Sequence, residues 1–342
     1  MHDIYYASGS LESFVSQVGV DDRPAHFMMV GTKPDLIKQA PILKELQKRG
    51  EKSFLVHTGQ HYDENLSKGI EKEFGLVVDA NLGVSGGILS TNIARIIERF
   101  GELLHAIKEA HPKVQIIPYV HGDTTTCFAT TTASFNLGFP VIHNEAGIRT
   151  FMIQKEVLDK FRHYEGSDFD FKRWFDLSSQ RENYSKGSHE PFPEQWNTRG
   201  SEAGSGLFMA PVALAKENLE NEGFPENRIF NVGNSVVDAM NFAGTINSDI
   251  FKKYPKLKKG FIRVCVHRRE NTESEVRFTA IFEMIEQLSI ETDQTILWIL
   301  LPGTLKAIKN FGFDERLKLL KKKEHVLISD VWPKYSDVMA AM

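Results

Sequence analysis

Short apolar runs alternate along the chain with longer segments that mix apolar and polar residues. The first apolar run is Phe27–Val30, and in the segment after it, Leu36–Arg49, apolar residues recur at near-helical spacing. Gly50 ends that predicted helix, and Ser53–His57 forms the next apolar run. Strands and helices that follow one another in this way predict an α/β fold with a mostly parallel sheet and helices on both faces.

Two later apolar runs each end in a His-X-acid triplet. Ile116–Val120 precedes His121-Gly122-Asp123, and Phe139–Ile142 precedes His143-Asn144-Glu145. The Thr- and Ala-rich segment 124–137 between them is long enough for a helix. In a strand–helix–strand unit both strand ends lie at the same edge of a parallel sheet, where open α/β sheets bind ligands. We therefore expect two carboxylates and two imidazoles to converge in one crevice.

The alternation is interrupted between Phe151 and Glu202, where charged and aromatic residues are dense. This predicts an irregular insertion over the surface, a candidate lid, because structureless loops of such length are uncommon unless they are functional or disordered. We expect a loose N-terminal extension over 1–26 and a first Rossmann-like domain over 27–233, with the insertion at 151–202. A second, nucleotide-binding Rossmann-like domain is expected over 234–342.

The second domain is expected to be incomplete. Only three apolar runs in it are predicted to be strands, whereas doubly wound sheets usually hold about five or six. These runs are Phe261–Val266, Thr295–Leu301 and His325–Ile328. Three parallel strands without further neighbours would expose a sheet edge, an aggregation liability unless something covers it.

Composition removes several classes of function. The chain has 41 Lys and Arg against 45 Asp and Glu, a net charge of −4 without a basic block, so neither nucleic acid nor an anionic membrane surface is an expected partner. Its apolar stretches are too short to span a bilayer, and its first residues lack the apolar core of a signal peptide. Cys127 and Cys265 stand in apolar surroundings and are predicted to be buried free thiols, which favours the cytoplasm.

Further polar clusters follow the predicted strands. The Gly31 turn, with Thr32 as predicted N-cap and Pro34 at the predicted first helical position, places Lys33 and Lys38 near a helix N-terminus, which favours an anion such as phosphate. The cations of His267–Arg269, after the first strand of the second domain, also suit a phosphate. A metal-dependent hydrolase is an alternative, with ligands among His57, His61, His121, Asp123 and His143.

Taken in order, these segments resemble the non-hydrolysing UDP-N-acetylglucosamine 2-epimerases. The resemblance implies two Rossmann-like domains facing a cleft, the GT-B arrangement. It also implies interconversion of UDP-N-acetylglucosamine and UDP-N-acetylmannosamine, or of a related UDP-amino sugar, by elimination of UDP and its re-addition with inversion at C2. The segments that carry the resemblance are Gly31–Lys38, His57–His61, His121–Thr126, His143–Thr150, Pro193-Glu194, Gly233–Ala239 and His267–Asn271.

The same resemblance implies roles for individual residues. A UDP-amino sugar is the implied partner, a homodimer is the implied assembly, and neither a metal nor a cofactor is implied. The catalytic residues that it implies are Asp123, Glu145, Glu194 and His267. The substrate-binding residues that it implies are Lys33, Lys38, His61, His121, Arg149, Asn234, Arg268 and Glu270.

Three departures from the family bear on activity. Lys33 stands where the family has an Arg, so a bidentate phosphate contact becomes a point charge. Leu301 and Gly303 stand where a His and an Arg are expected, and the family's Ser-Gly-Gly segment, which holds the diphosphate and ribose, does not occur up to Met342. We therefore expect weak UDP binding, and the alternative function is a non-catalytic or regulatory UDP-sugar-binding protein of the same fold.

Overall fold

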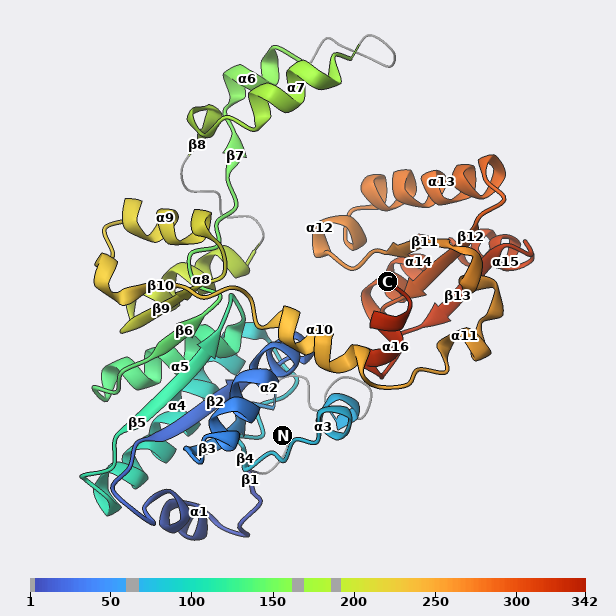
Figure 1. Ribbon diagram of the computed structural model, residues 1–342. Helices are drawn as coiled ribbons and strands as arrows, with labels where there is room; N and C mark the ends of the chain where they lie inside the picture. The colour runs from blue at the N-terminus through green and yellow to red at the C-terminus, as the bar shows by residue number, and fades with distance from the viewer. Residues whose placement is uncertain (1–3, 60–67, 162–168, 186–191) are drawn as a thin grey trace. The chain divides into compact units, whose positions relative to one another are not determined.

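The protein is described by a computed structural model over residues 4–59, 68–161, 169–185 and 192–342 (Figure 1). The chain forms two compact units, Met1–Ala239 and Met240–Met342. The sheet of the first unit is mostly parallel and that of the second is parallel over the described residues, and helices flank both. The predicted α/β class with two Rossmann-like domains is therefore confirmed.

The sheet of the first unit has eight strands in the order β1-β4-β3-β2-β5-β6-β9-β10. β2 lies at its centre and pairs in parallel with both β3 and β5. The chain runs outward from β2 through β3 to β4 and then returns to β5, and this reversal creates the switch point at which doubly wound sheets bind ligands. The strands are β1 (Tyr5–Tyr6), β2 (Ala25–Val30), β3 (Lys52–His57), β4 (Ala80–Asn81), β5 (Ile116–His121), β6 (Ile142–Asn144), β9 (Leu207–Ala210) and β10 (Ile229–Asn231).

Helices cover both faces of this sheet, with α2 on one face and α1, α4 and α5 on the other (Figure 1). α4 shows why these segments are helical: Ile96, Phe100, Leu103 and Ile107 repeat every three or four residues and all are buried. The helices are α1 (Leu11–Val18), α2 (Lys33–Lys48), α3 (Gly69–Phe74), α4 (Leu89–Ala110), α5 (Thr125–Asn136), α8 (Glu194–Ala203), α9 (Ala213–Asn221) and α10 (Val236–Gly244), with a 3₁₀ turn η4 (Glu226–Arg228).

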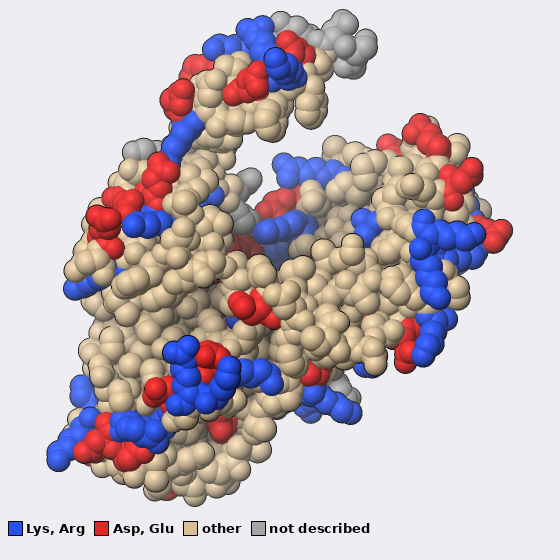
Figure 2. All heavy atoms as spheres, in the orientation of Figure 1, with Lys and Arg blue, Asp and Glu red and all other residues tan. Residues whose placement is uncertain are grey.

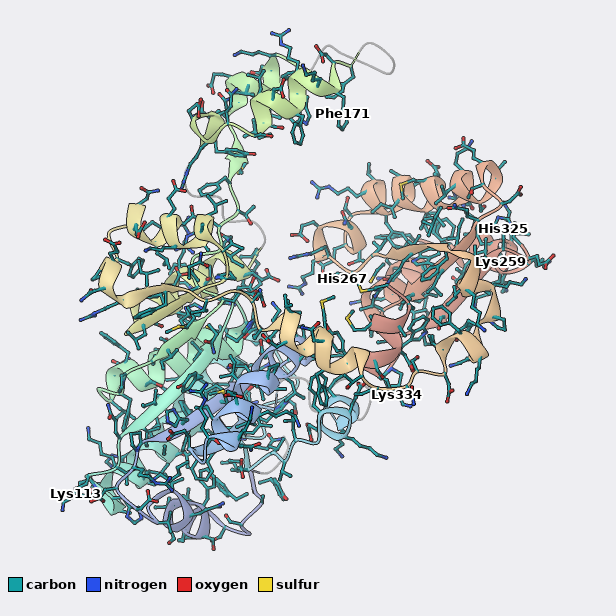
Figure 3. The ribbon with its side chains drawn as sticks, viewed as in Figure 1. Lys113, Phe171, Lys259, His267, His325 and Lys334 are labelled. Atoms are coloured by element: carbon teal, nitrogen blue, oxygen red, sulfur yellow. The ribbon has the colours of Figure 1, made fainter. Side chains whose placement is uncertain are left out.

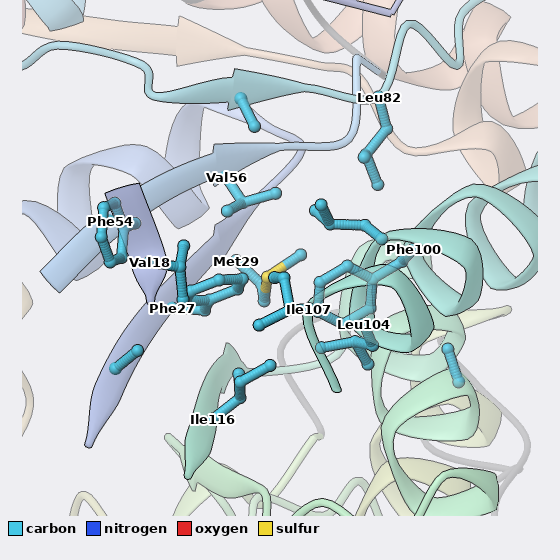
Figure 4. Packing of buried hydrophobic residues seen from close by; sticks show 14 of the residues in the cluster. Val18, Phe27, Met29, Phe54, Val56, Leu82, Phe100, Leu104, Ile107 and Ile116 are labelled. Atoms are coloured by element: carbon cyan, nitrogen blue, oxygen red, sulfur yellow. The ribbon is translucent and has the colours of Figure 1, made fainter. Parts of the chain in front are cut away.

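The largest core of the first unit lies between the sheet and the α1–α4–α5 face (Figure 4). Phe27 and Phe54, from adjacent strands, stand edge to face with ring centroids 5.5 Å apart, and Phe14 of α1 packs on both rings. The N-terminal stretch, expected to be loose, is therefore ordered from Tyr5 onward. A helix of only eight residues gives a weak sequence signal, and tertiary packing decides its structure.

α5 is buried although it is rich in Thr, and several of its hydroxyls find partners within the helix. Thr130 Oγ1 donates to the Thr126 carbonyl at 2.6 Å, and Ser134 Oγ donates to the Thr130 carbonyl at 2.7 Å. α5 packs between β5, α4 and α8. This close fit fixes the loops at both ends of α5, where the candidate site residues lie.

The described part of the insertion is more regular than expected. β7 (Met152–Ile153) pairs antiparallel with β8 (Tyr184–Ser185), and this ribbon carries α6 (Lys155–Asp159), α7 (Phe171–Ser178) and the 3₁₀ turn η3 (Arg181–Asn183). Phe161, Phe169 and Trp174 contact one another, which gives these helices a small aromatic core. The aromatic residues of the insertion predict an irregular loop, because ring contacts between residues that are distant in sequence leave no periodic pattern.

The second unit has a three-stranded parallel sheet in the order β11-β12-β13, so β11 and β13 each pair with β12 alone among the described residues. Trp298 is fully buried at its centre against Phe282. The three predicted strands are confirmed. The elements are α11 (Ile250–Lys253), η5 (Pro255–Lys259), β11 (Phe261–Cys265), α12 (Arg269–Thr272), α13 (Glu275–Glu291), β12 (Thr295–Leu300), α14 (Pro302–Asn310), α15 (Asp314–Lys321), β13 (Val326–Asp330) and α16 (Tyr335–Ala340).

Two expectations about the surface are corrected. Cys127 is buried as predicted, but Cys265 is exposed at the end of β11. The lysines of α11 and η5 are exposed, and Figure 2 shows basic side chains gathered on the second unit, in contrast to the prediction of no basic block. In the sequence these lysines are separated by apolar residues such as the buried Leu257, so they do not form a continuous basic run. Of the helices in the described segments, none has the length and apolar character needed to cross a membrane.

Candidate functional site at the strand ends of the first unit

The turn from β2 into α2 is held by a reciprocal cap. Thr32 accepts a hydrogen bond from the backbone N–H of Asp35, and the Asp35 carboxylate accepts from the backbone N–H groups of Gly31 and Thr32, at 3.2 Å each. The predicted N-cap is thus confirmed. Gly31 leaves no room for a side chain, since a Cβ there would lie 1.8 Å from Thr126 Oγ1. The absence of a side chain at Gly31 lets this turn pack directly against the start of α5.

Lys33 and Lys38 project from the first turns of α2. Lys38 Nζ lies 2.8 and 2.6 Å from the two carboxylate oxygens of Glu145, which is distant in sequence. Burial lowers the pKa of Lys33, and the charge of Glu73 opposes this shift. Lys38 is therefore tied to one of the proposed catalytic acids, a pairing that the sequence did not predict.

Glu145, just after β6, is the centre of the site. Its Oε2 accepts from the Asn234 amide at 2.7 Å and lies 3.4 Å from His121 Nε2, in addition to the Lys38 contacts. Burial raises its pKa, but the hydrogen bond and charge of His121, together with Lys38, outweigh burial and hold the pKa well below its usual range. Glu145 also has a positive φ of 62°, the left-handed region that L residues with side chains seldom adopt.

Asp123 and Glu194 belong to the same cluster. Burial raises the pKa of Asp123, and the negative charges of Glu194 and Glu145 raise it further. Glu194 is the first residue of α8, and Asn197 of the same helix donates to the Asp123 carbonyl at 3.0 Å. α8 thus returns the chain to this edge after the insertion, and the three predicted catalytic carboxylates are brought together.

A cavity of about 210 Å³ opens beside these residues. Glu145 and Asn234 face it, as does His121, so the carboxylate network borders a space open to small molecules. The volume is below the several hundred cubic ångströms of typical ligand sites. Its walls are Ile42, His121, Asn144, Glu145, Met209, Val232, Gly233, Asn234, Ser235 and Asp238.

Asp35 is a member of the site that sequence reasoning missed. It is fully buried, and its Oδ1 lies 3.9 Å from His121 Nδ1, on the side of the imidazole opposite Glu145. Burial raises the pKa of Asp35 to about 6, although the charge of His121 and the capping hydrogen bonds oppose that rise. The Thr-X-X-Asp pattern at a helix start could have drawn attention to Asp35, but only as a cap.

Two other histidines of the first unit, His143 and His57, have structural partners. His143 Nε2 lies 2.7 Å from the Gly122 carbonyl, so this nitrogen carries the proton, and burial lowers the His143 pKa. His57 Nδ1 accepts from the Gly59 N–H at 2.8 Å. His61, predicted to bind substrate, lies outside the described residues. Over those residues there is no group of three or more His, Cys, Asp or Glu side chains arranged to hold a metal ion.

Arg149 lies in a buried ion-pair network rather than in the cavity wall. Its guanidinium is fully covered, and it pairs with Glu202, also fully covered, and with Glu222. Glu202 in turn accepts from the Gly147 N–H at 2.6 Å. These contacts give Arg149 a role in holding the loop after β6 against α8 and α9, so its predicted substrate contact has no support from this geometry.

In the second unit, His267, Arg268 and Glu270 follow β11 at the carboxyl edge of its sheet (Figure 3 labels His267). His267 and Arg268 are exposed, whereas Glu270 is partly covered within α12. His267 Nδ1 lies 4.0 Å from Cys265 Sγ. The predicted strand-end position of this cluster is confirmed, and its substrate contacts stay predictions.

Comparison with known proteins places the chain among nucleotide-sugar epimerases. The family model for UDP-N-acetylglucosamine 2-epimerase matches residues 44–164 and 185–333. The UDP-N-acetylglucosamine 2-epimerase of Methanocaldococcus jannaschii is 28% identical over 305 residues, which cover 86% of this chain and 70% of that protein. The UDP-2,3-diacetamido-2,3-dideoxy-D-glucuronate 2-epimerase of Pseudomonas aeruginosa is 27% identical, over 85% of this chain and 71% of that protein.

Solved structures agree with the sequence matches. The M. jannaschii UDP-GlcNAc 2-epimerase in complex with UDP-GlcNAc and UDP has a TM-score of 0.69 and 26% identity, covering 92% of this chain and 75% of that chain. The Neisseria meningitidis UDP-GlcNAc 2-epimerase bound to UDP-GlcNAc has a TM-score of 0.69 and 25% identity, covering 93% of this chain and 75% of that chain. Since the family model spans most of the sequence, this chain belongs to the UDP-N-acetylglucosamine 2-epimerase family of isomerases.

Proposed function

We propose that this protein interconverts UDP-N-acetylglucosamine and UDP-N-acetylmannosamine, or a closely related UDP-amino sugar, by inverting C2. The observation that carries the proposal is the convergence of Asp123, Glu145 and Glu194 at the strand ends of the first unit, with Lys38 among them. At the switch point of a parallel sheet, the carboxylates can accept and donate a proton, and the lysine can stabilise an anionic leaving group.

The proposed reaction begins with elimination. A carboxylate removes the C2 proton, the C1–O bond to the diphosphate breaks, and UDP leaves with the electron pair while a C1–C2 double bond forms. UDP then adds back to C1 as a proton is delivered to the opposite face of C2. One face needs a base and the other an acid. Glu145, held as a carboxylate, suits the base, and Asp123, whose raised pKa favours the protonated form, suits the acid.

The cations assigned to the diphosphate are Lys33 and Lys38 of the first unit and His267 and Arg268 of the second. The helix N-terminus that carries the two lysines favours anions, which supports their assignment. We further propose that the second unit binds the nucleotide, with Glu270 as one of its contacts. His267→Asn should then slow turnover, because the leaving diphosphate loses a cationic partner.

Which UDP-amino sugar is turned over is a finer part of the proposal. Relatives named for UDP-N-acetylglucosamine and one named for a diacetamido glucuronate are almost equally similar to this chain. Both substrates share the UDP group and an acetamido group at C2, which are the parts that the reaction needs. A cytoplasmic homodimer also belongs to this proposal. The free Cys127 and Cys265 support a reducing location, and light scattering in solution would test the dimer.

Turnover in deuterium oxide tests the function directly. The protein incubated with UDP-N-acetylglucosamine should yield the epimer with deuterium at C2, because the removed proton exchanges with solvent before one is returned. Proton NMR of the C2 position measures both the product and its label. Epimer without deuterium would rule out the elimination route, and binding without any epimer would favour the non-catalytic alternative.

Chelation should leave activity unchanged. The charges assigned to the diphosphate are Lys, His and Arg side chains, so turnover should not depend on a divalent ion. Dialysis against EDTA, followed by the same assay with and without added magnesium or zinc, provides the measurement. A tenfold loss that a divalent ion restores, about 1.4 kcal/mol, would instead support the metal-dependent alternative.

A further inference from the structure

Asp35 combines a structural task with an unused oxygen. Its Oδ2 accepts both capping hydrogen bonds, from Gly31 and Thr32. Its Oδ1 is buried and has no hydrogen-bond partner. A buried carboxylate oxygen without a hydrogen bond is costly, so its retention needs a reason beyond capping, for which Oδ2 is sufficient.

The Oδ1 atom of Asp35 faces the His121 imidazole. His121 Nδ1 is 3.9 Å from Asp35 Oδ1, and His121 Nε2 is 3.4 Å from Glu145 Oε2, so the imidazole lies between two carboxylates. The side chain of His121 is only 4% exposed and that of Asp35 only 1%, so water does not screen the first contact. The three groups come from α2, β5 and the loop after β6, each held by the sheet.

We infer that Asp35 is a positioning residue that keeps a proton on His121 Nδ1, so that Nε2 is free to exchange a proton with Glu145. This inference rests on the proposed epimerase function of the same site. In this arrangement Asp35 and His121 form a carboxylate–histidine pair. The buried Asp35 fixes the tautomer and the orientation of the His121 ring, and Glu145 does the chemistry.

The proton balance of the step is closed. Glu145 takes the C2 proton as the diphosphate leaves with the C1–O electron pair. The proton then passes from Glu145 Oε2 to His121 Nε2, which makes an imidazolium whose positive charge the Asp35 carboxylate stabilises across 3.9 Å. In the reverse direction His121 returns the proton to Glu145. No oxidant, reductant or further reactant takes part.

Other ionisable groups act on this relay. On the elements packed against it, two of these groups are acidic and disfavour further negative charge near Asp35 and Glu145, and the other three are basic or neutral. They are Lys38 of α2, Asp123 after β5, Cys127 of α5, His143 of β6 and Glu194 of α8. Lys38 and Asp123 contribute opposite charges near Glu145, so the pH response assigned to Asp35 must be read from a variant of Asp35 itself.

Asp35→Asn tests the relay because an amide oxygen can still accept the capping hydrogen bonds while the charge is gone. We expect kcat to fall by about 10–100-fold, with KM changed less than twofold. In the wild type, kcat should fall as pH drops through about 6, where Asp35 becomes protonated. In Asp35→Asn this acid limb should be absent. Asp35→Glu should restore part of kcat and the limb.

Thr32→Ala is the matched control, because it removes the other half of the same cap and leaves the carboxylate in place. It should lower stability by about 1 kcal/mol. Its pH profile should keep the acid limb, displaced upward because the Thr32 hydrogen bond no longer lowers the pKa of Asp35. A profile that changes equally in both variants, or an Asp35→Asn enzyme with unchanged kcat and acid limb, would overturn the inference.

A measurement without turnover separates this inference from the proposed function. In protein labelled with ¹⁵N-histidine, the His121 signals, identified by their loss in His121→Gln, should show the proton on Nδ1 in the wild type. Asp35→Asn should shift that tautomer equilibrium. An unaltered His121 tautomer would refute the Asp35 assignment even in an active enzyme. The expected tautomer in a protein that does not epimerise would leave the positioning intact and reject the proposed reaction.

Discussion

Glu145→Gln should reduce epimerisation by a factor of about 10²–10⁴ while leaving the fold intact. The amide keeps the volume of the side chain and can still accept from Lys38 and Asn234, but it cannot take up a proton from C2. Because the loss is confined to the chemical step, kcat should fall and KM should change little. Steady-state kinetics with UDP-N-acetylglucosamine, together with loss of deuterium uptake at C2, measure the effect.

The comparison for this variant is Glu98→Gln, which makes the same chemical change on the exposed side of α4. It should match the wild type in kcat, in KM and in melting temperature. Equal activity in Glu145→Gln and Glu98→Gln would mean that the Glu145 network is structural, and the site would then have to be assigned elsewhere.

Glu202→Gln should lower the free energy of unfolding by about 3 kcal/mol, near the lower end of the range for breaking a buried ion pair. Both Glu202 and Arg149 are fully covered, so removing one charge leaves the other without water. Glu222 still pairs with Arg149, which is why the larger values in that range are not expected. Urea denaturation followed by circular dichroism gives the value.

Glu217→Gln serves as the surface counterpart, because Glu217 pairs with Arg181 where both side chains are about half exposed. An exposed pair contributes about 0–1 kcal/mol, so this variant should differ little from the wild type. KM for the UDP-sugar should be unchanged in both variants if Arg149 is a structural residue. A large rise in KM with unchanged stability in Glu202→Gln would restore the substrate role predicted for Arg149.

Much of the fold could be read from apolar periodicity. β2, β3, β5 and the helix after β2 lie nearly where they are expected, because buried parallel strands and amphipathic helices leave strong patterns. β6 (Ile142–Asn144) overlaps the expected strand 139–142 only at Ile142. α1 and the aromatic contacts of the insertion could not be read in this way. Their order depends on contacts with distant residues, such as Phe14 with Phe27, which periodicity does not record.

The candidate site was predictable in part for a related reason. Asp123 and Glu145 follow strands, so the topology of a parallel sheet brings them together. Asp35 was missed because an acid in the first turn of a helix is fully explained by capping, and nothing local distinguishes a cap from a partner of His121. The ion pairs of Arg149 could not be anticipated, because its two acidic partners lie far along the chain.

The backbone at Glu145 has a consequence for how this protein could change over generations. A side-chain-bearing residue held at a φ of 62° costs of order 1–3 kcal/mol, and glycine or asparagine would adopt that conformation more readily. Selection for stability alone would therefore favour the replacement of glutamate at this position, and only a requirement for its carboxylate opposes that replacement. A homologue that has abandoned catalysis should reveal itself first here, by a glycine or an asparagine in place of the acid.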